Sequence, residues 1–292
     1  MPRLRRAAAV GGVVLSLSVA ACSSGPGDAD PIGSSGPELG LEHVHGLGLD
    51  PADGVLYAAT HYGVWRIPDE GAATRVADRF QDTMGFTVVG PGTFLGSGHP
   101  DFRMDPDLPT RLGLIRSEDA GETWESLSLG GEADFHVLRA VHGKVYGWEA
   151  GTGRVMVSGD DGATWDARGA VDLRDLAVSP AEPDTLLATT GTGPLRSEDG
   201  GRTWVPVAAA PVLVVLAWAS PDSLYGVGPD GAVHHSADGG ITWLARGHVG
   251  GEPEALAVAR HDGAEFLLVA VSETGILSSS DGGASFALRH AE

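Results

Sequence analysis

The sequence has only one cysteine, Cys22, so no disulfide can form within the chain. Basic residues are also scarce: 19 lysines and arginines face 39 aspartates and glutamates, a formal net charge of −20. This charge disfavours nucleic-acid binding and charge-driven binding to anionic lipid, because the phosphate groups would be repelled. A nucleophile elbow, a phosphate-binding loop and a dinucleotide fingerprint are absent as well. The fold must therefore be held by its apolar core, and no common catalytic motif assigns an activity.

The first residues have the pattern of a targeting signal. Three arginines precede a short apolar run at residues 7–21, which is too short to span a bilayer comfortably and indicates a signal peptide over residues 1–21. Residues 19–22 read Val-Ala-Ala-Cys and resemble a bacterial lipobox. We therefore expect Cys22 to carry a lipid and residues 22–40 to form a flexible tether. The protein would then be extracytoplasmic, in the cell envelope, and would meet the membrane only through its lipid anchor.

An octapeptide of the pattern S-x-D-x-G-x-T-W organises the rest of the chain. It occurs at residues 117–124, 158–165, 197–204 and 236–243, and a fifth copy at 279–286 ends in Ser-Phe. The starting serines lie 41, 39, 39 and 43 residues apart. A period near forty residues is typical of a repeat architecture in which each unit is one supersecondary element.

The residue types of the octapeptide suit a tight turn. Its aspartate can accept hydrogen bonds from backbone N–H groups two residues on, and its glycine permits a positive φ. Its final aromatic ring is expected to pack between neighbouring units. The expected turn aspartates are Asp119, Asp160, Asp199, Asp238 and Asp281.

The octapeptides resemble the Asp-box, or BNR, repeats of β-propellers, a group that includes sialidases, sortilin-type ectodomains and photosystem II assembly factors. The resemblance covers residues 41–290 and implies an all-β propeller whose Asp-box turns lie on the face opposite the ligand site. It implies a fold and is silent about activity. Apolar runs separated by Gly, Pro and Asp predict four antiparallel strands in each repeat unit. This template predicts a six-bladed ring, with seven blades as the minor alternative, over residues 41–79, 80–130, 131–170, 171–210, 211–250 and 251–290.

Several polar residues are expected at the end of the ring opposite the octapeptides. They precede first strands or lie between second and third strands, and the second unit adds the longest insertion, residues 96–111. Imidazoles and carboxylates together suit a divalent transition metal, although polar lining of a water-filled channel without metal is the interpretation that we prefer from the sequence. No other cofactor is indicated. The preferred candidate ligands are His43, His45, His61, His99, Asp101, His136 and Glu149. Further polar residues expected at the same end are Asp82, Asp134, Asp172, Arg174, Glu252 and Glu254.

Sialidase activity is the enzymatic alternative that the resemblance invites. It implies a cluster of three arginines, a tyrosine nucleophile with a glutamate partner, and an aspartate that acts as the general acid. The sequence shows no evident set of three such arginines. The motif Arg66-Ile67-Pro68 falls on a third strand beside a degenerate turn, whereas the resemblance would place it on a first strand. We therefore expect a monomeric binding or assembly module for an envelope protein or glycan. A metal-dependent protein and a sialidase-type glycoside hydrolase are the alternatives.

Overall fold

The computed structural model describes residues 40–261 and 264–292. The expected signal peptide, Cys22 and the tether up to residue 39 lie outside these residues. The described part consists of strands and one 3-10 turn, η1 (Val76–Asp78). None of its helical segments is long and apolar enough to cross a membrane.

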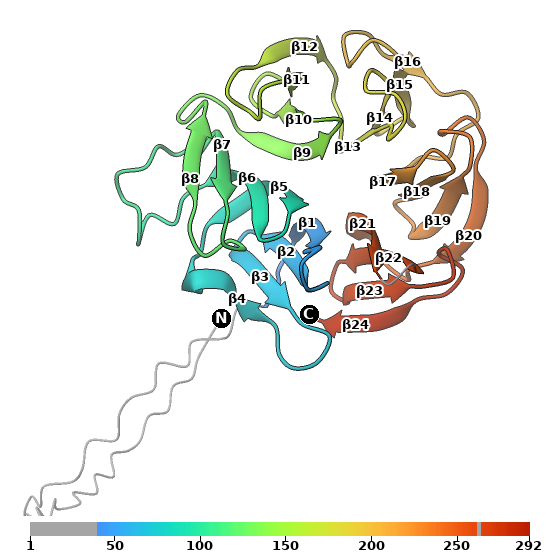
Figure 1. Ribbon diagram of the computed structural model, residues 1–292. Coiled ribbons are helices and arrows are strands. Elements are labelled where there is room, and N and C mark those ends of the chain that lie inside the picture. Colours follow the sequence, from blue (N-terminus) through green and yellow to red (C-terminus); the bar gives the residue numbers. More distant parts are fainter. Residues whose placement is uncertain (1–39, 262–263) are drawn as a thin grey trace, which may run out of the picture. The chain divides into compact units, whose positions relative to one another are not determined.

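Six sheets form a ring, and each sheet contains four strands that are consecutive in the sequence (Figure 1). We call these sheets blades one to six. The strands of the first three blades are β1 (Val44–Leu49), β2 (Leu56–Thr60), β3 (Gly63–Ile67), β4 (Thr74–Arg75), β5 (Asp82–Gly90), β6 (Thr93–His99), β7 (Leu114–Ser117), β8 (Glu125–Ser128), β9 (Phe135–Val141), β10 (Lys144–Glu149), β11 (Arg154–Ser158) and β12 (Asp166–Ala170).

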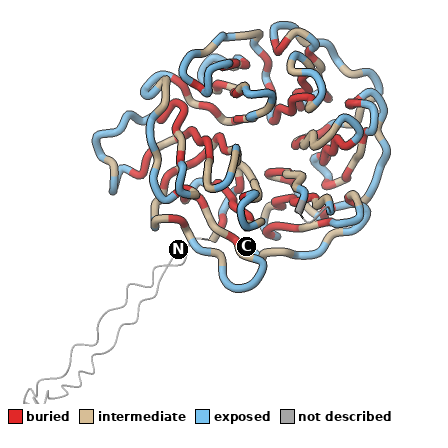
Figure 2. The backbone as a smooth tube through the Cα atoms, in the orientation of Figure 1, coloured by how far each residue is buried: buried red, intermediate tan, exposed pale blue. Residues whose placement is uncertain are grey.

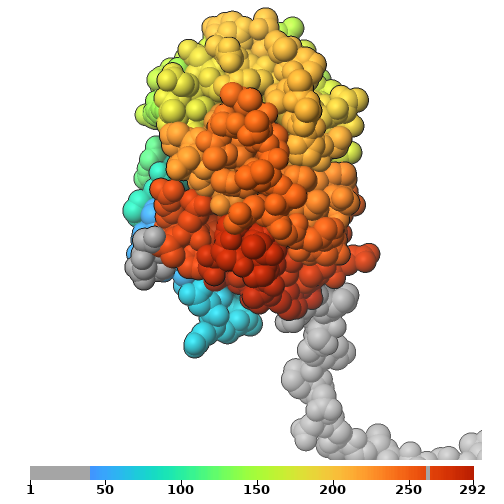
Figure 3. All heavy atoms as spheres, turned by 90° about the vertical axis from the view of Figure 1, so that its right-hand side faces the viewer, coloured from blue at the N-terminus to red at the C-terminus, as the bar shows by residue number. Residues whose placement is uncertain are grey.

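Blades four to six repeat the same plan. Figure 3 views the ring from the side of blade five (orange), which lies between blade four (yellow) and blade six (red). The strands of these blades are β13 (Asp175–Val178), β14 (Leu186–Thr189), β15 (Leu195–Ser197), β16 (Val205–Pro206), β17 (Val215–Ser220), β18 (Ser223–Val227), β19 (Ala232–Ser236), β20 (Leu244–His248), β21 (Pro253–His261), β22 (Ala264–Val271), β23 (Gly275–Ser279) and β24 (Ala287–Ala291).

Burial falls from the middle of each blade toward its outer strand (Figure 2). The second strands β2, β14 and β18 are buried along their whole length. The fourth strands β12 and β20 are mostly exposed. The apolar second strands therefore form the interior of the blades, and the polar fourth strands shield them from water.

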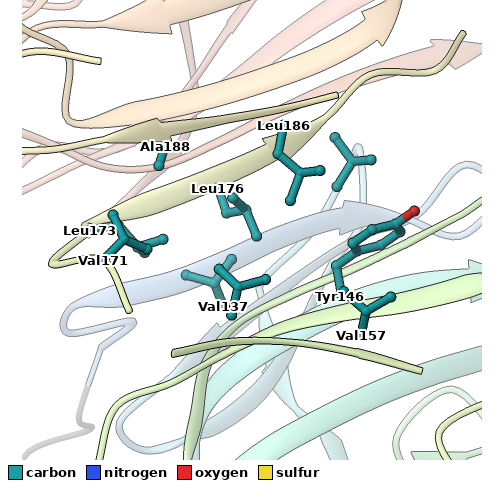
Figure 4. Close-up of a cluster of buried hydrophobic side chains, with 10 residues drawn as sticks. Val137, Tyr146, Val157, Val171, Leu173, Leu176, Leu186 and Ala188 are labelled. Carbon is teal, nitrogen blue, oxygen red and sulfur yellow. The ribbon is translucent and has the colours of Figure 1, made fainter. Parts of the chain in front are cut away.

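Apolar clusters fill the interfaces between neighbouring blades. In the cluster between blades three and four, Val137 and Tyr146 pack with Leu176 and Leu186 (Figure 4). A corresponding cluster joins blade one to blade six and includes Leu56, with Leu268 opposite it. Within residues 40–261 and 264–292, the first and last sheets exchange no strand, since each contains only consecutive strands. Side-chain packing between these two blades therefore closes the ring.

The octapeptides form the turns between the third and fourth strands of blades two to six. In blade two, the Ser117 hydroxyl accepts the N–H of Gly121 (2.8 Å), and Asp119 accepts both the N–H (2.8 Å) and the hydroxyl (2.6 Å) of Thr123. Gly121 has a φ of 92°, as the turn requires. The aromatic ring packs between blades as expected: Trp165 of blade three joins the apolar cluster that contains Leu114 of blade two, and its Nε1–H donates to Ser128 Oγ of blade two at 3.0 Å.

Candidate functional site

The two ends of the ring carry different loops. Because the strands of each blade are antiparallel, all first strands begin, and all second strands end, at one end of the ring. We call this the mouth end. The octapeptides follow the third strands and therefore lie at the opposite end, which we call the turn end. The five octapeptide aspartates are thus remote from the mouth.

A cavity of about 540 Å³ lies at the mouth end, and all six blades contribute to its lining. A smaller cavity of about 70 Å³ is lined by residues of the first strands, among them Arg139 and Asp175, which form an ion pair at 2.5 Å. The mouth is therefore a shared feature of the closed ring. Residues that represent the six blades in its lining are His45, Met84, His136, Arg174, Val214 and Glu254.

Four of these lining residues sit at β-bulges in the first strands of their blades. The pairing of β1 with β2 passes from Val44 to Gly46, so His45 is the extra residue. The same shift leaves Met84, His136 and Glu254 unpaired in blades two, three and six. A bulge re-aims the side chain of its extra residue, and these four residues all line the mouth.

Three histidines of blade one form a compact cluster at the mouth. The ring centroid of His45 lies 4.8 Å from that of His43 and 4.4 Å from that of His61. One nitrogen from each ring can be chosen so that all three atoms lie within 4.8 Å of one another. His45 and His61 approach to 3.2 Å between Nε2 and Nδ1. These residues therefore present the geometry of a potential metal site.

Two carboxylates, from blades two and six, complete this cluster. Asp82 Oδ1 lies 3.1 Å from His61 Nδ1 and 3.5 Å from His45 Nε2. Glu254 accepts a hydrogen bond from His43 Nδ1 at 3.2 Å and another from the Val44 N–H at 2.9 Å. Both carboxylates were among the polar residues expected from the sequence at this end of the ring, although neither was in the preferred ligand set. Alignment of the repeat units places Glu254 at this end, and the structure shows it at the bulge position that His45 occupies in blade one.

The local environment shifts the protonation equilibria of the cluster. The hydrogen bond that His43 donates to Glu254 raises the pKa of His43, whereas burial lowers the pKa of His45. Burial acts to raise the pKa of Asp82, but the hydrogen bond and charge of His45 and the charge of His61 outweigh it, and the net shift is downward. The cluster is therefore an electrostatically coupled unit.

His99 and His136 belong to a second group around Asp134. His136 Nε2 lies 3.2 Å from Asp134 Oδ2, and His99 Nε2 lies 3.8 Å from the same oxygen. The hydrogen bond from His136 lowers the pKa of Asp134. The five candidate histidines thus form two groups at the mouth end. His99 and His136 lie around Asp134, and the other three form the cluster of blade one.

The candidate carboxylates Asp101 and Glu149 bind groups in or near their own loops. Asp101 is 3% exposed, accepts the N–H of Phe80 at 2.9 Å and pairs with Arg103 at 2.6 Å. Glu149 accepts the N–H and the hydroxyl of Thr152 at 2.8 and 2.6 Å. Their oxygens hold loops in place, and the structure puts Asp82 and Glu254 beside the histidine cluster instead.

The arginine of the Arg66-Ile67-Pro68 motif lies toward the turn end. Arg66 is on β3, and its Nη2 lies 3.9 Å from Asp53 in the turn between β1 and β2. It is therefore not part of the mouth, which agrees with the position on a third strand that argued against a sialidase site.

The insertion predicted in blade two at residues 96–111 is only partly a loop. Its first four residues, 96–99, belong to β6, and Pro100, which cannot donate a hydrogen bond to the ladder, follows the strand. We call residues 100–111 the mouth loop, because it connects a second to a third strand. Three large apolar side chains of this loop are exposed: Phe102 (49%), Met104 (50%) and Leu108 (41%).

Comparisons with known proteins relate the chain to others by fold. No model of a protein family and no curated protein matches the sequence. YCF48 from Cyanidioschyzon merolae has a similar structure, with a TM-score of 0.52 and 13% identity over 85% of this chain and 84% of that one. The GH74 xyloglucanase from Xanthomonas campestris gives 0.55 and 20%, over 85% of this chain and 45% of the enzyme.

An ancestral GH74 enzyme gives a TM-score of 0.54 at 14% identity, over 84% of this chain and 38% of the enzyme. This chain thus spans less than half the length of either GH74 enzyme that it matches. At these identities the likeness concerns the fold alone. The predicted six-bladed β-propeller with four-stranded antiparallel blades is confirmed.

Proposed function

We propose that this protein is an extracytoplasmic, lipid-anchored module that binds another protein of the cell envelope through the mouth end of its propeller. The observation that carries the proposal is the mouth loop, which exposes Phe102, Met104 and Leu108 on one short segment. Neighbouring exposed apolar side chains of this kind are typical of protein interaction sites. The lipid anchor inferred from the N-terminal sequence supplies the location.

Hydrogen bonds hold the mouth loop in one conformation. Asp101 accepts the backbone N–H groups of Met104 and Asp105 through its carbonyl oxygen, at 3.0 and 2.8 Å. Arg79 pairs with Asp105, and His99 Nδ1 contacts the carbonyl oxygen of Thr110 at 2.6 Å. A preorganised loop loses little conformational entropy on binding, so its exposed apolar side chains can contribute to affinity.

Affinity capture from detergent-solubilised envelopes, with matched variants, tests this proposal. We expect the wild-type protein to retain a partner protein that a Phe102→Ser, Met104→Ser, Leu108→Ser variant loses. The control variant, Ile241→Ser with Leu244→Ser, removes two apolar residues that are 64% and 65% exposed at the turn end, and it should retain the partner. The affinity of the identified partner should fall at least about tenfold in the loop variant alone.

Equal capture by the loop variant and the wild type would contradict a binding surface at the mouth loop. Capture of a glycan in place of a protein would contradict the choice of partner. Hydrolysis of chromogenic glycosides by the purified protein would favour the enzymatic alternative, in which carboxylates of the mouth would have to serve as acid and nucleophile.

A further inference from the structure

We propose that His43, His45 and His61, together with Asp82, bind one divalent transition-metal ion at the mouth. This site is independent of the mouth loop, so it can hold or fail whether or not the loop binds a protein. It would join two blades directly, since the histidines belong to blade one and Asp82 belongs to blade two. Glu254 would add blade six through its contact with His43.

Three potential ligand atoms form a nearly equilateral triangle. The separations are 3.2 Å between His45 Nε2 and His61 Nδ1, 3.1 Å between His61 Nδ1 and Asp82 Oδ1, and 3.5 Å between His45 Nε2 and Asp82 Oδ1. In a tetrahedral site with metal–ligand bonds of about 2.0–2.1 Å, neighbouring ligand atoms lie about 3.3–3.4 Å apart. The triangle therefore matches one face of a coordination tetrahedron.

Hydrogen bonding alone does not account for this triangle. Each imidazole nitrogen carries at most one proton, and an ionised carboxylate carries none. His45 Nε2 and His61 Nδ1 therefore supply at most two protons for three close contacts. A cation at the centre would satisfy all three atoms at once, because each would direct a lone pair toward it.

His43 would supply the fourth ligand, since one of its ring nitrogens lies within 4.8 Å of a ring nitrogen of His45 and of His61. Its Nδ1 contacts Glu254 Oε1 at 3.2 Å, so Nε2 is the ring nitrogen that remains available among the contacts of the described residues. Metal-binding histidines commonly donate their other ring N–H to a carboxylate, which orients the ring. Glu254 is itself held by the Val44 N–H at 2.9 Å and is largely buried. It would act as a positioning residue, and not as a ligand.

The backbone around the cluster departs from regular geometry at two nearby positions. His43 has a φ of 53°, in the left-handed region that residues other than glycine seldom adopt. His45 is the extra residue of a β-bulge. Such departures persist where the surrounding structure imposes them, and they concentrate at functional sites. Here they bring both rings against His61.

The ligand set selects the class of metal. Three imidazoles and one carboxylate suit Zn²⁺ and Cu²⁺, whereas Mg²⁺ and Ca²⁺ prefer sites made of oxygen atoms. Affinity for sites of this kind generally rises along the first-row series to Cu²⁺ and falls again at Zn²⁺. We therefore expect both ions to bind, Cu²⁺ more tightly than Zn²⁺.

Calorimetric titration of the metal-free, full-length protein tests the site with Zn²⁺, Cu²⁺ and Mg²⁺ as probes. The wild type should bind one Zn²⁺ or one Cu²⁺ per chain and give no binding heat with Mg²⁺. His61→Ala should weaken Zn²⁺ binding at least about tenfold. His61 lies in an exposed turn, so this variant should fold, and Asp82→Asn provides a second variant of nearly unchanged shape. The matched control is His136→Ala, which removes a mouth imidazole outside the cluster and should change the affinity less than about twofold.

Electron paramagnetic resonance of the Cu²⁺ complex provides a readout of the ligands. The wild-type spectrum should contain couplings to imidazole nitrogens that change in His61→Ala and persist in His136→Ala. Absence of Zn²⁺ and Cu²⁺ binding by the wild type would overturn the proposal. Wild-type affinity in both His61→Ala and Asp82→Asn would overturn it equally, since the ion would then be bound elsewhere.

Discussion

Each octapeptide aspartate uses both carboxylate oxygens to hold its turn. Asp199 accepts the Thr203 N–H at 2.9 Å on one oxygen and the Thr203 hydroxyl at 2.6 Å on the other. These hydrogen bonds, with those from Ser197 and Arg202, lower the pKa of Asp199 from 3.8 to about 2. The corresponding hydrogen bonds from Thr242, with those from Ser236 and Ile241, lower the pKa of Asp238 to about 2. The turns therefore depend on carboxylates that stay ionised in the folded state to well below their ordinary pKa.

The stability of the protein should consequently fall in acid. Because the folded-state pKa of Asp199 lies below the unfolded value, its stabilising effect is complete above about pH 4 and is lost as the pH falls toward 2. Asp199→Asn should lower the Tm at pH 7 and should lose less further Tm than the wild type between pH 4 and pH 2. Thermal denaturation followed by circular dichroism measures both.

Glu198→Gln is the matched control for this prediction. It changes a carboxylate in the same turn whose side chain is 76% exposed and pairs with Arg196 at the surface. It should leave the Tm at pH 7 nearly unchanged, since exposed ion pairs contribute little. An Asp199→Asn protein with the wild-type Tm at pH 7 would contradict the role assigned to this carboxylate.

Among the elements, the mouth loop shows how one buried residue can hold a segment in place. Asp101 accepts the N–H groups of Phe80 (2.9 Å) and Arg103 (3.0 Å) and pairs with the Arg103 side chain. The hydrogen bond to Arg103 lowers the pKa of Asp101. Its carboxylate therefore ties the loop to the segment before β5, while the loop's apolar side chains remain exposed.

Removal of the Asp101 carboxylate should release this loop. In Asp101→Ala the N–H of Phe80 would lose its partner, at a cost of about 1–3 kcal/mol. Hydrogen exchange in residues 100–111 should accelerate, whereas exchange in β13–β16, which form blade four, should stay unchanged. Asp107→Ala, an exposed substitution in the same loop, serves as the control. Unchanged protection of the loop in Asp101→Ala would refute this assignment.

At the scale of the whole propeller, the first and last blades meet without exchanging a strand in the part of the chain that the structure describes. Leu56 and Ile67 of blade one pack against Leu268 and Ile276 of blade six, and Glu254 accepts the N–H of Val44 across the same interface. This interface closes the ring at the place where the histidine cluster lies. A metal bound there should therefore stabilise ring closure, because it would bind the folded state alone.

Attachment to the membrane is predicted to depend on one residue outside the propeller. Cys22→Ser should prevent lipidation and move the protein from the membrane fraction to the soluble extracytoplasmic fraction, with its Tm unchanged. Cell fractionation and immunoblotting measure the distribution, and Ser23→Ala is the matched control. Mass spectrometry of the native protein that finds an unmodified Cys22 would exclude the anchor.

The sequence alone determined the features that arise within one repeat. The octapeptide bonds join residues two to four positions apart, such as Ser117 to Gly121 and Asp119 to Thr123, so a short motif is enough to encode them. Five copies of that motif at a period near forty residues then located the turns of blades two to six, and the four-strand pattern of the repeat unit added the first blade.

Only the tertiary structure decided which polar residues meet at the mouth. His61 and Asp82 are 21 positions apart, and His43 and Glu254 are 211 positions apart, at opposite ends of the propeller sequence. Their contacts depend on ring closure and on one-residue bulges, and a bulge leaves no periodic signal in the sequence. The candidate carboxylates Asp101 and Glu149 instead accept backbone N–H groups of their own loops, because nearby N–H groups compete for a carboxylate. Such local hydrogen bonds also become visible only in the structure.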